Sequence, residues 1–281
     1  MPAFDTPEPI TAEIDVYLGR VRVRASDRAD TVVEVRPSDP SAEASVQAAE
    51  RTAVEFSGGR LLVKGPRPKG LAYLRSWRGS IDVTVDLPAG SRLEADVATD
   101  LIATGTLGGT VLRSANGDLH LAETGALEAR ASNGDISVER VNGPAEATAS
   151  VGTIRLGTID GPGTVKNSTG AILLGEATGD LQLKTATGDI TIDRALAGVS
   201  AKSAHGRIRI GAAVSGSLHL ENGSGKVDVG IAEGTAAWLD LHSKNGVVRN
   251  VLDSAESPAT TDTVVEVHAH TNYGDIDVHR S

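Results

Sequence analysis

Hydrophobic and polar positions alternate in short runs that recur about every 18 residues through the middle of the chain. The phrase appears three times in succession as "NSTGAILLGEATGD", "TATGDITIDRALAG" and "SAHGRIRIGAAVSG", each time with a glycine before the alternating run. Alternation with a period of two predicts strands that bury one face. Because one copy is too short to cover its own buried face, the repeat predicts copies that stack as coils.

The glycine lies between two predicted strands of each copy. Glycine adopts a positive φ at little cost, and aspartate tolerates such a backbone better than most residues, so we expect a turn with a left-handed or strained backbone here. Alignment on this position gives Asp100 in a first copy, followed by Gly117, Gly134, Gly152, Gly170, Gly188, Gly206, Gly225, Gly246 and Gly274. The alternation then predicts that Leu181, Leu183, Ile190 and Ile192 point inward, with equivalent positions in the other copies.

These positions predict an all-β fold, a parallel β-solenoid of about ten coils over residues 91–281. Aromatic residues are only 2% of the chain although 40% of it is hydrophobic, so small aliphatic side chains must fill a narrow core. A column of mostly small polar residues lies three positions before each turn glycine, where a hydroxyl or amide can bond a backbone group of the turn. Its members are Ser114, Ala131, Ala149, Asn167, Thr185, Ser203, Asn222, Ser243 and Thr271.

Residues 1–90 do not follow this frame, and we interpret them as a β-rich cap that is continuous with the solenoid. We expect a strand pair around Leu18 and Gly19, a strand at 31–37, a hairpin at Gly58 and Gly59, and one short helix within 39–52. Terminal units of repeat proteins cover strand edges and apolar side chains that would otherwise be exposed. At the other end, the last coil, "TNYGDIDVHRS", is predicted to leave a free strand edge.

Three phrases carry a family resemblance: "VDLPAGS" before the first coil, "GTAAWLDL", and the terminal "TNYGDIDVHR". With the repeated glycine turns they resemble a bacterial putative adhesin family of β-strand-repeat proteins, a domain of unknown function. The resemblance covers nearly the whole chain. It implies a β-solenoid and brings no established chemistry.

Composition excludes several function classes. The chain has no cysteine, which excludes disulfides and thiolate sites, and its net charge of −10 argues against general nucleic-acid binding. The start, "MPAFDTPEPITAEIDVYLG", lacks the basic and apolar stretches of an export signal. No run approaches the roughly 18 apolar residues of a membrane span. We therefore expect a cytoplasmic protein without a membrane span, not one displayed at the cell surface.

Candidate chemistry is sparse. Calcium-binding β-rolls need Gly-Asp phrases in both turns of a coil, whereas this chain offers one per coil at best. No nucleophile elbow, zinc-protease helix or phosphate-binding loop is present in the sequence, so we predict no catalytic residue and no cofactor. Outward positions of the last coils bring metal-competent side chains to one face: Asp240, His242, His268 and His270. We interpret this face as a solvated polar surface and expect no tight metal binding.

Two basic features are candidate contact surfaces. The segment "KGPRPKGLAYLRSWRG" combines cations and aromatic rings as a binding loop does, in Lys69, Tyr73, Arg75, Trp77 and Arg78. An outward column is basic in several coils and has the arrangement that tracks an anionic polymer: Arg113, Arg130, Lys166, Lys184 and Lys202. The neighbouring Glu128 and Glu146 and the acidic total charge weigh against this.

We therefore predict a non-catalytic interaction or scaffold protein that binds a protein partner of unknown identity. We expect it to be a monomer or a limited homodimer. The alternative is a sugar-active or metal-dependent β-helix enzyme. A partner captured without turnover of glycans favours the first function, and a fully occupied metal site with lyase or hydrolase activity favours the second.

Overall fold

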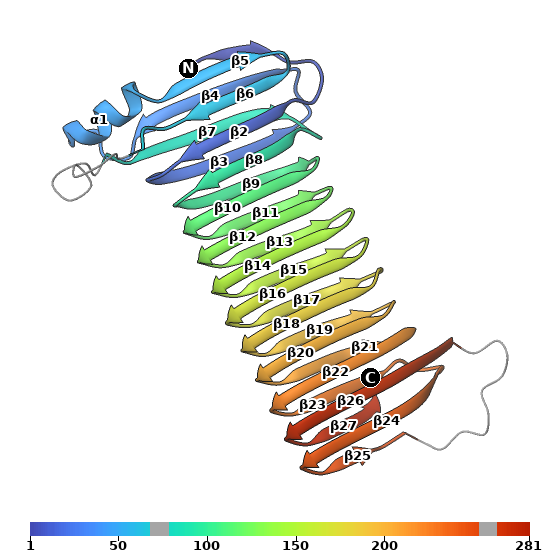
Figure 1. The fold of residues 1–281 in the computed structure, drawn as a ribbon. Coiled ribbons are helices and arrows are strands. Elements are labelled where there is room, and N and C mark those ends of the chain that lie inside the picture. Colours follow the sequence, from blue (N-terminus) through green and yellow to red (C-terminus); the bar gives the residue numbers. More distant parts are fainter. Residues whose placement is uncertain (68–78, 253–262) are drawn as a thin grey trace. The chain divides into compact units, whose positions relative to one another are not determined.

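The computed structural model describes residues 1–67, 79–252 and 263–281, which form 27 strands and one helix (Figure 1). The predicted all-β fold is confirmed. The chain divides into two compact units, Met1–Val138 and Glu139–Ser281, and the boundary falls within β13 (Ile136–Val141). The predicted contact loop with Lys69, Tyr73, Arg75, Trp77 and Arg78 lies outside the described residues.

In the first unit, the strands are arranged in two sheets, and most neighbouring strands are parallel. One sheet has the order β1 (Ala3–Asp5), β4 (Asp30–Pro37), β7 (Ile81–Pro88), β3 (Gly19–Ser26), β9 (Asp100–Leu107) and β11 (Leu119–Thr124). The other has the order β5 (Ala53–Ser57), β6 (Arg60–Lys64), β2 (Thr11–Val16), β8 (Arg92–Val97), β10 (Thr110–Asn116) and β12 (Leu127–Asn133). The pairs β1–β4, β4–β7 and β5–β6 are antiparallel, and they lie at one end of each sheet.

Strands β2 and β3 form a coil of the solenoid, which corrects the expectation that residues 1–90 depart from the repeat. β2 pairs in parallel with β8, and β3 pairs in parallel with β9. Gly19, the first residue of β3, has a φ of 125° like the later turn glycines. A segment of about 65 residues separates this coil from the next one, so the regular repeat of the sequence does not reach it. A division between cap and solenoid at residue 90 stays a prediction.

The predicted place of Asp100 in the glycine column is wrong by one residue. Leu119 pairs with Leu101, so Thr99 occupies the position equivalent to Gly117, and Asp100 follows it. No non-glycine residue among those described has a positive φ. The hydroxyl of Thr99 instead donates a hydrogen bond to the carbonyl oxygen of Gly19.

The predicted helix and hairpin of the first unit are both present. Helix α1 (Glu43–Glu50) contacts β4 and β7 and buries Ala48. It lies within the predicted range and begins after a turn in which the Asp39 carboxylate accepts hydrogen bonds from the backbone amide and the hydroxyl of Ser41, at 2.9 and 2.7 Å. This local turn competes with the helix for those residues. The hairpin joins β5 and β6.

The second unit contains two parallel sheets. One has the order β15 (Ile154–Ile159), β17 (Ile172–Ala177), β19 (Ile190–Ala195), β21 (Ile208–Ala213), β23 (Val227–Ile231), β27 (Ile276–Arg280) and β25 (Val248–Asn250). The other has the order β14 (Ala145–Val151), β16 (Gly163–Thr169), β18 (Leu181–Thr187), β20 (Val199–His205), β22 (Gly216–Ser224), β26 (Thr263–Tyr273) and β24 (Thr235–Asn245). The parallel β-solenoid predicted from the repeat is confirmed.

The buried positions of this unit follow the predicted alternation. Ile172, Ile190 and Ile208 pair in register 18 residues apart and are fully buried. The turn glycine between the strands is required by close packing of neighbouring coils. Gly188 has a φ of 147°, and a Cβ atom on it would lie 2.0 Å from the carbonyl oxygen of Gly170. The interior of the solenoid is therefore a column of aliphatic side chains closed at one edge by contacting glycines.

The polar column before the turn bonds the backbone as predicted. Six of its side chains donate hydrogen bonds to turn-glycine carbonyl oxygens: Ser114 to Gly117, Asn167 to Gly152, Ser203 to Gly188, Asn222 to Gly206, Ser243 to Gly274 and Thr271 to Gly225, at 2.8–3.4 Å. Five of the six reach the glycine of the adjacent coil and so link one coil to the next.

The last two coils do not stack in chain order. β22 pairs with β26, and β26 pairs with β24. In the other sheet β27 likewise lies between β23 and β25 (Figure 1). The expectation that "TNYGDIDVHRS" supplies the free edge is wrong, because the coil made by β24 and β25 occupies that end of both sheets. The exposed side chains Val247 and Val248 belong to this coil.

Candidate functional site

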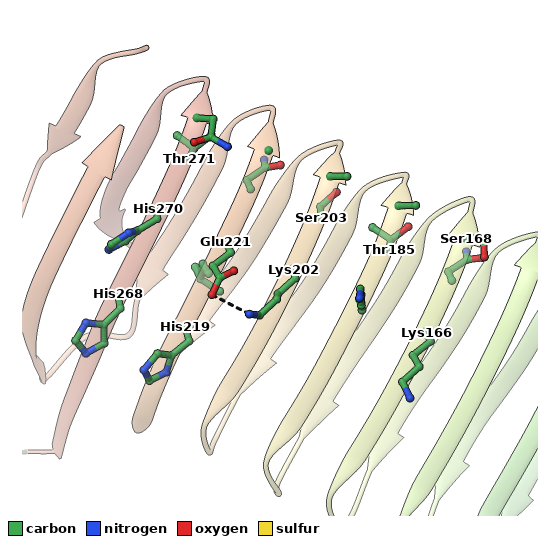
Figure 2. A pocket seen from close by; sticks show the side chains of 18 of the residues that line it. Lys166, Ser168, Thr185, Lys202, Ser203, His219, Glu221, His268, His270 and Thr271 are labelled. Carbon is green, nitrogen blue, oxygen red and sulfur yellow. Dashed lines mark hydrogen bonds and ion pairs between the residues drawn. The ribbon is translucent and has the colours of Figure 1, made fainter. Parts of the chain in front are cut away.

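A groove of about 920 Å³ crosses the outer face of the second unit's β14–β26–β24 sheet (Figure 2). Its charged and ring-bearing lining residues are Lys166, Lys184, Lys202, His219, Glu221, Asp240, His242, Lys244, His268 and His270. They come from outward positions of consecutive strands, because side chains alternate between the core and the outer face. The groove therefore runs across the strands, from coil to coil.

One wall of the groove is a column of lysines in register. Lys166 pairs with Lys184 and Lys184 with Lys202 in the parallel sheet, so their side chains leave neighbouring strands side by side. The Lys202 ammonium lies 2.8 Å from the Glu221 carboxylate on the next strand. Lys166 and Lys184 have no carboxylate within ion-pair distance in the described part of the chain.

Many charged side chains elsewhere among the described residues lie in opposite pairs. In the first unit, Arg113 and Arg130 both lie beside Glu128, at 3.6 and 3.3 Å. On the outer face of the second unit's other sheet, Arg194 lies 3.8 Å from Glu176. The predicted basic column is thus neutralised where arginines form it. A free positive charge remains at Lys166 and Lys184.

The strip beside the lysines consists of small residues. Ser168, Ala186, Ala204 and Gly223 line the groove next to the lysine column. Small side chains leave the backbone of the strands within reach of a bound molecule. The lysines and this strip together form a trough with one cationic wall.

Imidazole rings occupy the end of the groove at β22 and β26. The rings of His219 and His268 stack with their centroids 4.8 Å apart, and Figure 2 shows them side by side on adjacent strands. Trp238, which is 56% exposed, lies against His268 at 5.2 Å. The chain order of the last coils creates this stack, because β26 and not β24 is the neighbour of β22.

The four candidate metal ligands lie on the adjacent strands β24 and β26. Oδ2 of Asp240 is 3.4 Å from Nδ1 of His268 and 3.7 Å from Nε2 of His270. The His242 and His270 rings are 6.0 Å apart. Across the described ranges, no group of three or more histidine and carboxylate side chains is arranged to hold a metal ion. Weak metal binding at this face stays a prediction.

The Gly-Asp turns, considered as calcium ligands, have a structural role that the sequence analysis missed. Three of these carboxylates accept a hydrogen bond from a backbone amide of an adjacent coil: Asp118 from Asp135 at 2.8 Å, Asp189 from Arg207 at 2.7 Å, and Asp275 from Val247 at 2.9 Å. In the sequence, this role is indicated by an aspartate that directly follows a turn glycine in a copy that has another copy stacked on it. These oxygens therefore hold coils together.

An ion-pair cluster joins the last coils on the sheet opposite the groove. The ammonium of Lys226 is 2.7 Å from Asp277, and the Arg249 guanidinium bonds both Asp275 and Asp277. The hydrogen bond from Lys226, followed by the one from Arg249, holds the pKa of Asp277 below its usual range despite partial desolvation. The pKa of Asp275 is lowered first by the Val247 amide and then by Arg249.

The chain belongs to the Toastrack DUF4097 family, whose model matches residues 12–281. Several solved structures are similar to the chain. One is a putative adhesin from Bacteroides fragilis, with 13% identity, 99% and 95% of the two chains covered and a TM-score of 0.32. A putative lipid binding protein from Parabacteroides distasonis has 10% identity, 100% and 95% coverage and a TM-score of 0.37. A putative cell adhesion protein from Clostridium sporogenes has 9% identity, 100% and 98% coverage and a TM-score of 0.21.

No curated protein is significantly similar to the chain. Among the described residues, no helix has both the length and the apolar character needed to cross a membrane.

Proposed function

We propose that this protein is a non-catalytic interaction or scaffold protein that holds a partner against the outer face of the β14–β26–β24 sheet. The observation that carries the proposal is the groove, which presents the same kind of side chain on successive coils. A row of like side chains makes many similar contacts with an extended partner. An enzyme active site instead brings chemically different side chains together at one point.

The alternative function, a sugar-active or metal-dependent β-helix enzyme, is favoured by no specific observation on the described residues. The candidate ligands Asp240 and His268 contact each other across two strands. Of the lysines in the column only Lys202 has an ionisable partner, the Glu221 carboxylate, and this ion pair favours the charged ammonium and not a base. Binding through a rigid sheet is the simpler use of this surface, because the strands hold the side chains in fixed register.

The test is affinity purification from the native host with three forms of the full chain, followed by mass spectrometry. The wild type is compared with Lys166→Gln/Lys184→Gln, which removes the two charges of the lysine column that have no carboxylate partner. The matched control, Arg155→Gln/Arg207→Gln, removes two charges from outside the groove's lining. We expect the wild type and the control to enrich the same partner and the lysine variant to lose it. Equal enrichment by all three forms contradicts the proposal.

The cytoplasmic location and the monomeric or dimeric state predicted from the sequence are parts of this proposal. Cell fractionation tests the location. Light scattering over a range of concentrations tests the oligomeric state, and growth beyond a dimer contradicts it. The relevant strand edges are those of β24 and β25, where Arg249 places charge beside the exposed Val248.

A further inference from the structure

The lysine column carries a repulsion that folding does not require. Lys166, Lys184 and Lys202 stand on strands about 4.8 Å apart, and like charges directly opposite each other in a sheet are destabilising. Only Lys202 is relieved by a carboxylate, that of Glu221. An anion bound along Lys166 and Lys184 removes the remaining repulsion.

The groove is cationic although the chain is acidic. Its lining contains four lysines against the two carboxylates of Glu221 and Asp240, whereas the whole chain has a net charge of −10. The positive potential is therefore local, and it favours an anionic partner of moderate charge density. A densely charged polymer would leave most of its charge unpaired beside an acidic protein.

The two ends of the groove have different chemistry. The end at Lys166 and Lys184 offers free ammonium groups, and the end at His219 and His268 offers stacked rings next to the exposed Trp238. A protein segment carries both carboxylates and apolar or aromatic side chains, so it can complement both ends. A polyphosphate or a uronic acid chain repeats one kind of group.

Resting on the proposed function, we propose that the groove binds an extended acidic peptide segment of the partner. Its carboxylates lie along Lys166 and Lys184, and an aromatic side chain packs on the ring end at His268. From Lys166 to His270 the groove crosses five successive strands, roughly 20 Å. About six extended residues span that distance. The small side chains of Ala186 and Ala204 let the peptide backbone approach the sheet.

The probe is the synthetic peptide acetyl-Glu-Glu-Glu-Gly-Gly-Phe-amide with a fluorescent label, titrated with the full-length protein at low and physiological salt. We expect saturable binding that weakens as salt rises, because exposed charges are screened. We expect Lys166→Gln/Lys184→Gln to weaken it about tenfold, as for the loss of two ion pairs at this kind of surface. The Arg155→Gln/Arg207→Gln control binds like the wild type. The wild type should bind the same peptide with glutamine in place of glutamate no more tightly than the lysine variant binds the acidic peptide.

Three results overturn the inference. The first is no detectable binding of the acidic peptide. The second is equal weakening by the lysine and arginine variants while both keep the wild-type melting temperature. The third is binding of inorganic polyphosphate or oligogalacturonate as tight as that of the peptide, which would assign the groove to another class of polyanion. If the lysine variant still loses the captured partner but the peptide does not bind, the inference fails and the proposed function stands.

Discussion

The side-chain amide of Asn222 donates a hydrogen bond to the carbonyl oxygen of Gly206, 2.8 Å away in the preceding coil. Because Asn222 is buried, its amide takes the place that a water molecule would otherwise have as the donor to the Gly206 carbonyl oxygen. The equivalent hydroxyl of Thr185, also buried, has no hydrogen-bond partner among the described residues. The same column thus contains one side chain that ties two coils together and one that does not.

Replacing Asn222 is therefore expected to cost more than replacing Thr185. Asn222→Ala leaves a part-buried carbonyl group without its donor, which costs about 0.5–1.5 kcal/mol in the free energy of unfolding. Thr185→Val keeps the shape and removes a hydroxyl that bonds nothing, so stability should stay the same or rise slightly. Chemical denaturation of both variants measures the difference. A larger loss for Thr185→Val would contradict this account of the column.

The inward position of Ile190 makes it sensitive to charge. Ile190→Asp places an unpaired carboxylate between Ile172 and Ile208 and should cost several kcal/mol. Thr191→Asp, one residue along, points outward beside Arg209 and should be nearly silent. Thermal melting of the two variants tests the register, and comparable shifts would show that the alternation is wrongly assigned.

Contact between turn glycines predicts that Gly188→Ala is severely destabilising. The added Cβ would meet the Gly170 carbonyl oxygen at 2.0 Å on a backbone with a φ of 147°. Gly109→Ala is the matched control, because the nearest atom to its added Cβ is a side-chain nitrogen of Arg92 at 3.6 Å. We expect a large fall in melting temperature for the first variant and a small change for the second. Similar effects would contradict the close approach of neighbouring coils.

The ion pairs of Asp277 predict a pH dependence with a definite sign. Lys226 lowers the pKa of Asp277 in the folded state, so its ionised form stabilises the fold above the unfolded-state pKa, about 3.9. That stability is lost as the pH falls through the lower folded-state pKa. Asp277→Asn should therefore lower the melting temperature at neutral pH, and its difference from the wild type should shrink in acid.

A control for this pH dependence is Asp27→Asn, at an exposed position of the first unit. Its difference from the wild type should stay small across the same pH range. A constant difference for Asp277→Asn from neutral pH to pH about 3 would rule out the proposed linkage.

The histidine face is expected to bind metal only weakly. Titration with Zn²⁺ against a competing chelator should show surface-type binding, because Asp240 bridges two rings at hydrogen-bond and ion-pair distances without a closed set of ligands. A sub-micromolar site that disappears in His242→Ala/His270→Ala would contradict this and would revive the metal-dependent alternative.

Local physical rules in the sequence determined the coil. The alternation around Ile190 and Ile192 shows which face is buried, since side chains on a strand alternate with a period of two. The glycine of each copy marks the turn, and the polar residue three positions earlier marks the hydrogen bond to a backbone carbonyl. These features depend on neighbours within a few residues or on the identical position one copy away.

Only the tertiary structure decided which copies are neighbours. Ala269 and Leu241 both satisfy the alternation as partners of Leu220, so periodicity cannot distinguish between them, and the fold pairs Leu220 with Ala269. Likewise, β2 belongs to its sheet because it pairs with β8, although the two strands are far apart in the chain. The stack of His219 on His268, and with it the ring end of the groove, exists because β22 pairs with β26. Sheet pairing is a long-range interaction between backbones, and a repeated local pattern does not specify its order.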